Sequence, residues 1–492
     1  MTVATLSTSR TSPTTVEADA LVVGVRKGAD GPEVVGPLAD VITSLGAIGV
    51  TGARDELTRL PGDGVSASSI ALIGLGDTID EESLRYAAGS AVRQLTGLDR
   101  VALALVVSTE QEALAVLEGA AIASWEFDGF RHSSASPTRR HARDLVLVTE
   151  FEVGTGAVTR AGIVAEAVHT VRDLAMTPPE QLSPEALADA AVAHASGADL
   201  TVTVLGDAEL REGGYGGILG VGQGSSRGPR LVKVEYSPAG AAKHVALVGK
   251  GITYDTGGLS LKPAASMLGM KDDMTGAATV LAVTVAAAKL ALPVRLTAWL
   301  CIAENMPSGS AIRPDDVLTI RGGTTVEVTN TDAEGRLVMA DGLVAASEEH
   351  PDAIIDVATL TGAQVVALGT RYVGVMGDSG LAAEVVATAD AAGETFWHMP
   401  LPGELRSRLN SDVADLVNAT PGNTAAGMLL AGVFLQEFVG KRVDSESRIP
   451  WAHLDIAGPS VNKGGGWGFT GKGSTGVAVR TLIELADKFS AA

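Results

Sequence analysis

Three charged side chains stand at alternate positions in residues 330–337, which read NTDAEGRL in a chain otherwise rich in alanine, valine and glycine. They are Asp332, Glu334 and Arg336. Side chains alternate between the two faces of an extended segment, so this spacing predicts that all three share one face, about 7 Å apart. Such a face could supply hard oxygen ligands for a cation and a clamp for an anion. A solvent-exposed edge strand is the alternative, because charged residues are also typical of strand edges.

Two further carboxylates, Asp255 and Asp273, fall where ligands usually bind in α/β proteins. The apolar strand HVALVG (244–249) leads directly into KGITYDTGGLSLK (250–262), which places Asp255 beyond the carboxyl end of that strand. Asp272 and Asp273 precede an apolar helix that we expect over 274–290. Capping of this helix is enough to explain Asp272. Asp273 joins the candidate ligands.

The residue types favour a metal site built from carboxylates. The eight histidines are scattered, the chain has one cysteine, and no HExxH sequence is present, so a His/Cys zinc site is not expected. Carboxylate oxygens suit Mg²⁺, Mn²⁺ or a carboxylate-bound Zn²⁺. Four carboxylates exceed what one ion usually needs, but bridging carboxylates can hold two ions about 3.5–4 Å apart. The residues alone therefore suggest a two-metal hydrolase.

Strands alternating with helices are expected to position these residues, in two blocks of a 492-residue chain. The first block has strands at 21–25, 69–75, 101–107 and 144–149, and helices near 35–46, 81–95 and 110–126. The first 18 or so residues resemble a low-complexity tail, and 130–143 is expected to be a loop. A boundary near 150–165 precedes a helix over 164–175, which ends at a double proline.

The second block has strands at 200–205, 230–236, 244–249, 294–302, 353–359 and 450–456, and helices near 274–290, 338–348, 381–392, 427–439 and 475–488. We expect an N-terminal α/β domain over 1–160, a connecting helix and Pro-Pro turn over 161–180, and a catalytic domain over 181–492. Glycines at 220–224 indicate a turn. Residues 466–473 miss a phosphate loop by one residue, since Gly473 replaces the Ser or Thr that binds magnesium.

Composition excludes several classes of function. A formal net charge of −21 argues against broad contact with nucleic acid or an anionic membrane. The longest apolar run, 276–288, is too short to span a bilayer, and the first residues lack a secretory signal. Cys301 is the single cysteine, so no intrachain disulfide can form. A cytoplasmic location is expected.

Four motifs occur in an order that resembles the leucyl aminopeptidase family (cytosol aminopeptidase, peptidase family M17). They are GKGITYDTGGLSLKP (249–263), MKDDMTGAA (270–278), NTDAEGRL (330–337) and ATLTGA (358–363). The resemblance covers about 165–492 throughout and is weaker before that. It implies an α/β fold of two domains, each a mixed, mostly parallel sheet flanked by helices, with the C-terminal domain catalytic.

The resemblance also assigns site residues. Asp255 and Glu334 would bridge two divalent ions, Lys250 and Asp273 would complete the tighter site, and Asp332 the more exchangeable one. As a ligand, Lys250 must be a neutral amine. Lys262 and Arg336 would be catalytic without binding metal. The implied substrate-binding residues are Met270, Asn330, Thr359 and Gly362.

The implied function is a cytosolic aminopeptidase that removes N-terminal leucine and other apolar residues from peptides, by attack of water activated between two ions. The ions would be Mn²⁺ or Zn²⁺, with Mg²⁺ or Co²⁺ as further candidates. Lys262 would stabilise the tetrahedral intermediate, and Arg336 would hold a bicarbonate that takes part in proton transfer. Family members form homohexamers.

Two alternatives stay open. One is an added DNA-binding regulatory role, which would need a basic patch made by Arg131, Arg139, Arg140 and Arg143. The other is a two-metal hydrolase of another ester or amide, such as a phosphate ester.

Overall fold

The computed structural model describes residues 3–491 except 37, 40, 41, 43, 44, 132, 133, 135–139 and 444. Contacts divide the chain into two compact units, of which the first comprises Met1–His169 with Asn462–Gly473 and the second Thr170–Val461 with Ser474–Ala492. The sequence boundary near 150–165 lies close to this division. Residues 462–473 belong to the first unit, although the expected catalytic domain over 181–492 includes them.

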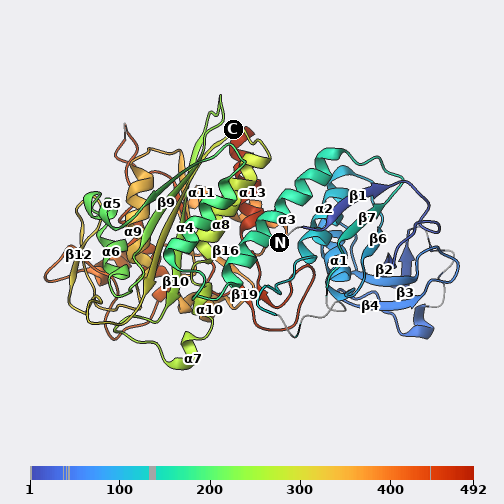
Figure 1. Ribbon diagram of the computed structural model, residues 1–492, viewed down its shortest axis with the longest axis horizontal. Helices are drawn as coiled ribbons and strands as arrows, with labels where there is room; N and C mark the ends of the chain where they lie inside the picture. The colour runs from blue at the N-terminus through green and yellow to red at the C-terminus, as the bar shows by residue number, and fades with distance from the viewer. Residues whose placement is uncertain are drawn as a thin grey trace. The chain divides into compact units, whose positions relative to one another are not determined.

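The first unit is built on a seven-stranded sheet with the order β1-β7-β6-β2-β5-β4, in which β3 pairs with β2 (Figure 1). Only the β4–β5 and β2–β3 pairs are antiparallel among these described strands. Helices α1 and α2 pack against one face. The elements are β1 (Thr5–Ser9), β2 (Ala20–Gly28), β3 (Gly31–Val35), η1 (Leu45–Ile48), β4 (Leu57–Pro61), β5 (Ser69–Gly76), α1 (Glu81–Gln94), β6 (Arg100–Ala104), α2 (Glu110–Ala123) and β7 (Asp144–Val148).

Local sequence explains the two helices. Asp80 accepts the backbone N–H of Ser83 at the start of α1, and Thr109 does the same for Glu112 at the start of α2; both form capping boxes. The helices expected near 81–95 and 110–126 are therefore confirmed, with ends that differ by up to three residues. Both begin where a side chain satisfies the first free amides.

Two expectations for the first unit were wrong. None of the described residues of the helix expected over 35–46 is α-helical, since Val35 ends β3 and the 3₁₀ turn η1 begins at Leu45. Positions 37, 40, 41, 43 and 44 of that range lie outside the described residues. The supposed N-terminal tail contains β1, which pairs in parallel with β7. Its polar sequence, TLSTS, gives no apolar run to detect.

The second unit is built on an eight-stranded mixed sheet with the order β16-β15-β18-β14-β10-β11-β9-β8 (Figure 1). Its strands are β8 (Thr201–Leu205), β9 (Arg230–Tyr236), β10 (His244–Asp255), β11 (Arg295–Asn305), β14 (Ala353–Ala358), β15 (Val373–Gly377), β16 (Phe396–His398) and β18 (Trp451–Asp455). A smaller sheet joins β12 (Val317–Thr319), β13 (Thr325–Glu327) and β17 (Leu416–Val417), and β19 (Val461–Asn462) pairs with β20 (Gly473–Ser474).

Helices flank both faces of the larger sheet. The helices of this unit are α4 (Pro184–Ala195), α5 (Asp207–Glu212), α6 (Gly216–Gly222), α7 (Ala264–Met267), α8 (Thr275–Lys289), α9 (Gly335–Ser347), α10 (Gly362–Leu368), α11 (Ser379–Ala392), α12 (Gly427–Gln436) and α13 (Val479–Ala491), of which α7 is a short, exposed turn in the loop after β10. Helix α3 (Thr155–Met176) runs from the first unit into the second. Across the ranges given above, no helix combines the length and the apolar character that a membrane span requires.

The centre of this sheet positions the site. Strand β10 pairs in parallel with β11 on one side and β14 on the other, so their carboxyl ends lie at the same edge. Helix α8 packs closely on one face, because a Cβ on Gly276 would lie 2.1 Å from the carbonyl oxygen of Val357. Helix α9 packs on the opposite face, where Gly335 lies against Lys250.

Two local expectations in the second unit differ from the structure. Residues 220–224, expected to be a turn, are helical up to Gly222, where α6 ends, and turn only at 223 and 224. Residues 330–337 are not extended, since the chain turns at Thr331 and Asp332 and α9 begins at Gly335. The alternating spacing of Asp332, Glu334 and Arg336 therefore does not place them on one face of a strand.

Candidate active site

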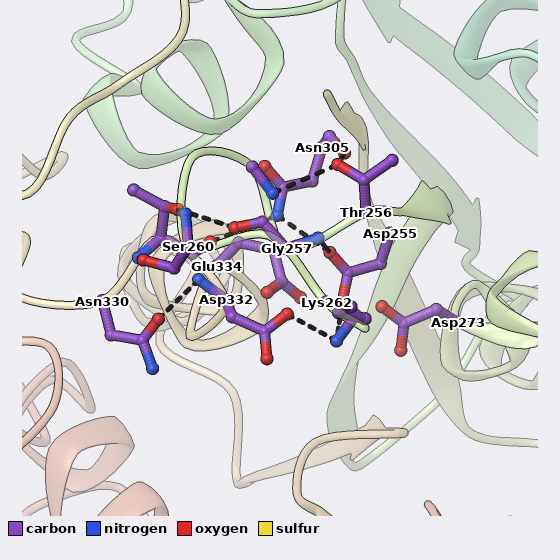
Figure 2. A network of polar contacts seen from close by, with 12 residues as sticks. Asp255, Thr256, Gly257, Ser260, Lys262, Asp273, Asn305, Asn330, Asp332 and Glu334 are labelled. Carbon is purple, nitrogen blue, oxygen red and sulfur yellow. Dashed lines mark hydrogen bonds and ion pairs between the residues drawn. The ribbon is translucent and has the colours of Figure 1, made fainter. Parts of the chain in front are cut away.

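Three buried carboxylates converge at the carboxyl ends of the central strands. Asp255 ends β10, Asp273 follows the short 3₁₀ helix Met270–Asp272, and Glu334 precedes α9. One ligand oxygen from each lies within 4.8 Å of the other two. Their exposed fractions are 2%, 7% and 1%. Figure 2 shows the three carboxyl groups turned toward a common centre.

Two lysines compensate part of this negative charge. The Lys250 ammonium lies 2.8 Å from Asp273 Oδ1 and 2.9 Å from Glu334 Oε1. The Lys262 ammonium lies 2.8 Å from Asp255 Oδ2 and 2.5 Å from Asp332 Oδ1 (Figure 2). Four carboxylates around two ammonium groups leave an excess of negative charge when all are ionised. Buried charge of this kind is stable only when it is paired or binds a cation.

The protonation of these groups reflects that imbalance. Burial, together with the charge of Asp255, raises the pKa of Glu334 to about 8. Burial raises the pKa of Asp273 to about 6, although Lys250 opposes the shift. Burial lowers the pKa of Lys250, but Asp273 and Glu334 outweigh it, so that this pKa lies above the usual range. These shifts all favour bound protons, because each proton offsets part of the excess negative charge of the site.

The donor set fits divalent cations. Within the described residues, Asp273 Oδ2 and Glu334 Oε2 are buried and accept no hydrogen bond. Buried carboxylate oxygens without partners are rare, and oxygen ligands are what Mg²⁺ and Mn²⁺ prefer. Lys250 is held as an ion-pair partner here, and it would ligate a metal only after losing its proton.

Backbone amides and polar side chains fix the carboxylates in place. Asp255 Oδ1 accepts hydrogen bonds from Asn305 Nδ2 and from the backbone N–H of Gly257, both at 2.8 Å. Gly257 has φ +86°, and a Cβ on it would lie 2.7 Å from Asp332 Oδ1. This position therefore requires glycine, both for its conformation and for the approach of Asp332.

Asp332 lies in a turn that is held by its neighbours. Asn330 Oδ1 accepts the backbone N–H of Asp332 at 2.9 Å. Thr331 Oγ1 accepts from the backbone N–H of Ser260 at 2.7 Å and donates to the carbonyl of Gly257 at 2.6 Å. These contacts join the turn to the loop after β10, as Figure 2 shows.

Arg336 lies beside the cluster in sequence but makes no salt bridge within the described part of the chain. Its Nη1 donates to the carbonyl oxygen of Asn418 at 2.6 Å, and its guanidinium lies 6.0 Å from the ring centre of Phe434. Its Nε is buried without a hydrogen-bond partner among the described residues. Burial lowers the pKa of Arg336 to about 10 against the opposing charges of Glu334 and Asp455. The guanidinium is thus a cation available to an anion.

The four expected substrate-binding residues differ in their relation to the cluster. Thr359, directly after β14, donates from Oγ1 to Asp273 Oδ1 at 2.7 Å, and its carbonyl accepts from Lys250 at 3.1 Å. The Asn330 side chain holds the Asp332 turn. Met270 is half-buried in the 3₁₀ helix, and Gly362 is exposed at the start of α10, where an added Cβ would meet no atom within 4 Å. Their binding roles stay predictions.

Sequence reasoning missed four residues that support this site: Ser260, Asn305, Thr331 and Asn418. Isolated Ser, Thr and Asn residues carry no periodic pattern. Asn305 alone gave a usable signal, because it ends a buried apolar strand next to Asp255, at an edge where side chains reach ligands.

The fold and the site together define an α/β enzyme whose centre is lined by buried carboxylates and lysines. The model of the cytosol aminopeptidase family catalytic domain matches residues 169–483, and that of the family's N-terminal domain matches residues 35–134. The chain belongs to the cytosol aminopeptidase family and is an aminopeptidase.

Relatives and solved structures agree with this assignment. A probable cytosol aminopeptidase of Clavibacter michiganensis is 59% identical over 502 residues, and one of Leifsonia xyli is 56% identical over 495 residues; both alignments cover 100% of each chain. Bottromycin maturation enzyme BotP in complex with Mn has a TM-score of 0.85 at 37% identity, covering 96% of this chain and 100% of that one. A mutant of tomato leucine aminopeptidase has a TM-score of 0.85 at 28% identity, covering 99% and 97%.

Proposed function

We propose that this aminopeptidase removes N-terminal leucine and other apolar residues from peptides and works with two divalent ions. Mn²⁺ and Zn²⁺ are the first candidates, with Mg²⁺ and Co²⁺ next. The observation that carries the proposal is the cluster of Asp255, Asp273 and Glu334, with ligand oxygens within 4.8 Å and two buried oxygens lacking partners. The Mn-bound BotP structure and the tomato leucine aminopeptidase support it.

Five residues would hold the ions: Lys250, Asp255, Asp273, Asp332 and Glu334. When bound, the ions would acidify a water molecule and polarise the scissile carbonyl. The protein's own contribution is to hold the carboxylates in place. Asn305 and Thr359 donate to Oδ1 of Asp255 and Oδ1 of Asp273, which orients both carboxylates, and Asp273 Oδ2 has no hydrogen-bond partner among the described residues.

Lys262 is proposed to stabilise the oxyanion that forms when the carbonyl is attacked. Burial lowers its pKa, but Asp255 and Glu334 outweigh burial and raise the pKa above the usual range, so the side chain stays an ammonium at neutral pH. A positioned cation in a buried site stabilises developing negative charge strongly. Its side chain is 15% exposed, which leaves it accessible to substrate.

Arg336 is proposed to hold a small anion such as bicarbonate, which would accept and release the proton of the attacking water. Its partnerless buried Nε and its lack of a carboxylate partner within the described ranges support this role. Met270, Thr359 and Gly362 would contact the first side chain of the substrate, and Asn330 would be a further substrate-binding residue. The open space at Gly362 is consistent with room for leucine or methionine.

Substitution at the site tests the proposal. We expect Glu334→Gln and Lys262→Ala to abolish Mn²⁺-stimulated hydrolysis of leucine amide while the far-UV circular dichroism spectrum is kept. Glu334→Gln should also lower the amount of bound Mn²⁺, whereas Lys262→Ala should retain it. Near-normal turnover in either variant contradicts the mechanism. Hydrolysis of a phosphate ester by the wild-type enzyme, without release of leucine, favours the alternative hydrolase.

Assembly and partners are proposed by family resemblance. We propose a cytoplasmic homohexamer acting on peptides, which sedimentation velocity would test. For the DNA-binding alternative, Arg140 lies 4.0 Å from a Glu126 oxygen and 3.9 Å from an Asp128 oxygen, and Arg139 falls outside the described residues. With a net charge of −21, a nucleic-acid partner is not proposed. Duplex binding at low salt would reverse this view.

A further inference from the structure

Asn418 is a fully buried polar residue that belongs to none of the proposed catalytic or ligand positions. It follows directly after β17, which pairs in parallel with β13, and its exposed fraction is 0%. Its backbone N–H donates to the carbonyl of Glu327 at 3.0 Å. The small sheet of β12, β13 and β17 therefore brings this residue alongside the segment that leads into the Asp332 turn.

The side-chain amide of Asn418 is used entirely by that segment. Its Oδ1 accepts the backbone N–H groups of Thr329 at 2.8 Å and Asn330 at 3.2 Å. Its Nδ2 donates to the carbonyls of Asn330 at 2.7 Å and Ala333 at 3.4 Å. Backbone N–H groups face the amide oxygen, and backbone carbonyls face the amide nitrogen. Neither Asp nor Leu could therefore replace Asn418 without losing hydrogen bonds.

The backbone carbonyl of Asn418 has a second role, because it accepts the hydrogen bond from Arg336 Nη1 at 2.6 Å. Among the described residues, this is the one hydrogen bond that the Arg336 guanidinium donates, and its Nε has no hydrogen-bond partner. One residue thus contacts both the turn that carries Asp332 and the guanidinium of Arg336.

We propose that Asn418 is a positioning residue that couples the Asp332 side of the metal centre to the anion site at Arg336. The inference rests on the proposed function and deepens it. Asn418 is none of the five proposed metal ligands, and it acts by fixing the turn and the guanidinium together. Its loss should therefore weaken the ion held through Asp332 more than the ion held by Lys250 and Asp273, which lie on other elements.

The test is calorimetric titration of the metal-free full-length enzyme with Mn²⁺. Asn418→Asp keeps the shape but places a carboxylate oxygen against the carbonyls of Asn330 and Ala333. We expect the weaker of two binding events to lose about 10–100-fold in affinity, as for other residues that orient ligands, and the tighter event to change less than about threefold. kcat should fall more than KM rises. Asn410→Asp, the same substitution at an exposed position eight residues earlier, is the matched control and should leave both events unchanged.

Unchanged affinities and kcat in Asn418→Asp overturn the inference, and so does an equal loss at both events, which indicates a merely structural role. If Asn418→Asp does not fold, Asn418→Ser carries the same titration with the same expectations. A wild-type enzyme that binds no Mn²⁺ contradicts the proposed function and the coupling together. Two bound ions in the wild type with no selective loss in the variant contradict the coupling alone.

Hydrogen exchange of the wild-type enzyme gives a measurement that needs no variant. Mn²⁺ should slow amide exchange in residues 329–333 and in residues 416–418 together, because each segment holds the other. Protection of 329–333 with no change in 416–418 overturns the inference.

Discussion

Glu334 shows how a residue suited to binding a metal ion destabilises the fold when no ion is bound. It is 1% exposed, one of its oxygens lacks a hydrogen-bond partner among the described residues, and the neighbouring charge of Asp255 adds to the effect of burial on its pKa. A cation bound at the cluster removes both difficulties, because it ligates the free oxygen and favours the ionised form.

Metal-free enzyme should lose stability as pH rises from about 5 to 8. The pKa of Glu334 is raised to about 8 and that of Asp273 to about 6. In this window the folded state binds more protons than the unfolded state, so the free energy of unfolding falls with pH. Thermal unfolding measured across this range checks the prediction, and Mn²⁺ should raise Tm more at pH 8 than at pH 6. A flat profile in the metal-free wild type would contradict the assigned shifts.

Thr359 offers a second prediction at the residue scale. Thr359→Val keeps the shape but removes the hydroxyl that donates to Asp273 Oδ1 at 2.7 Å. We expect Mn²⁺ affinity to weaken by about tenfold, because ligand-orienting hydrogen bonds typically have effects of that size. Calorimetric titration measures it. Thr201→Val, at an exposed position of β8, is the control and should bind Mn²⁺ as the wild type does.

At this scale the sequence predicts the charged residues of the site but not the residues that hold them. Asp255, Asp273 and Glu334 carried a chemical signal, and the structure brings them together. Asn305 and Asn418 could not be singled out, because a lone Asn is far more often a turn or surface residue. Their importance comes from contacts between segments 50 to 90 residues apart.

At the scale of elements, the site depends on how closely α9 approaches β10. A Cβ on Gly335 would lie 2.5 Å from Lys250 Cε and 2.7 Å from its Nζ. The first residue of the helix is therefore glycine because the lysine side chain occupies that space. On the other face of β10, Gly276 of α8 is constrained by backbone atoms.

Gly335→Ala should keep the fold and lose the metal centre. Alanine is favoured over glycine in helices by up to about 1 kcal/mol, and the clashing atoms belong to the end of a flexible side chain. Lys250 would have to move away from Asp273 and Glu334, so we expect little change in Tm and a large loss of bound Mn²⁺, measured by metal analysis. Gly276→Ala should instead fail to fold, since its Cβ would meet the Val357 carbonyl. Equal behaviour of the two variants would contradict this distinction.

Buried apolar strands and capped helices were predictable, and short polar elements were not. Strands β5 and β14 are buried and apolar, and each matches an expected strand to within one residue at either end. Strand β10 begins with the strand expected over 244–249 but continues to Asp255, so that Asp255 is its last residue and does not lie beyond its end. The extended conformation predicted for residues 330–337 is wrong, because their charges alternate as in a strand while the Asn330 side chain closes a turn before α9. The hydrogen bond from the Asp332 backbone to the Asn330 side chain therefore decides the conformation of this segment, and the alternation of charges does not.

At the scale of the whole molecule, the first unit includes residues far away in sequence. Phe469 packs against its core, where a Cβ on Gly89 would lie 2.5 Å from the Phe469 Cβ. Asp55 accepts hydrogen bonds from the backbone N–H of Gly468 at 2.9 Å, from Ser90 at 2.6 Å and from Arg93 at 2.8 Å. Asp55 thus anchors the segment 462–473 to the unit.

Asp55→Asn should loosen this segment without affecting the metal centre. Asn tolerates the left-handed backbone at this position, φ +65°, but it loses the negative charge that pairs with Arg93. We expect a loss of about 1–3 kcal/mol in unfolding free energy and faster hydrogen exchange in 462–473, with Mn²⁺ binding unchanged. Urea unfolding and exchange mass spectrometry measure these. Asp63→Asn, an exposed position, should change neither; no difference between the two variants would contradict the anchoring role.

The place of residues 462–473 also constrains the order in which a new chain can fold on the ribosome. The first unit is missing part of its packing until residue 473 has been synthesised, about 300 residues after His169. At about 5–20 residues per second, this delay is roughly 15–60 s. During that time the surface that receives Phe469 stays uncovered, although the rest of the unit is complete. The first unit of this protein is therefore completed only near the end of synthesis. A chain released before residue 469 would leave the surface around Gly89 exposed to chaperones or to aggregation.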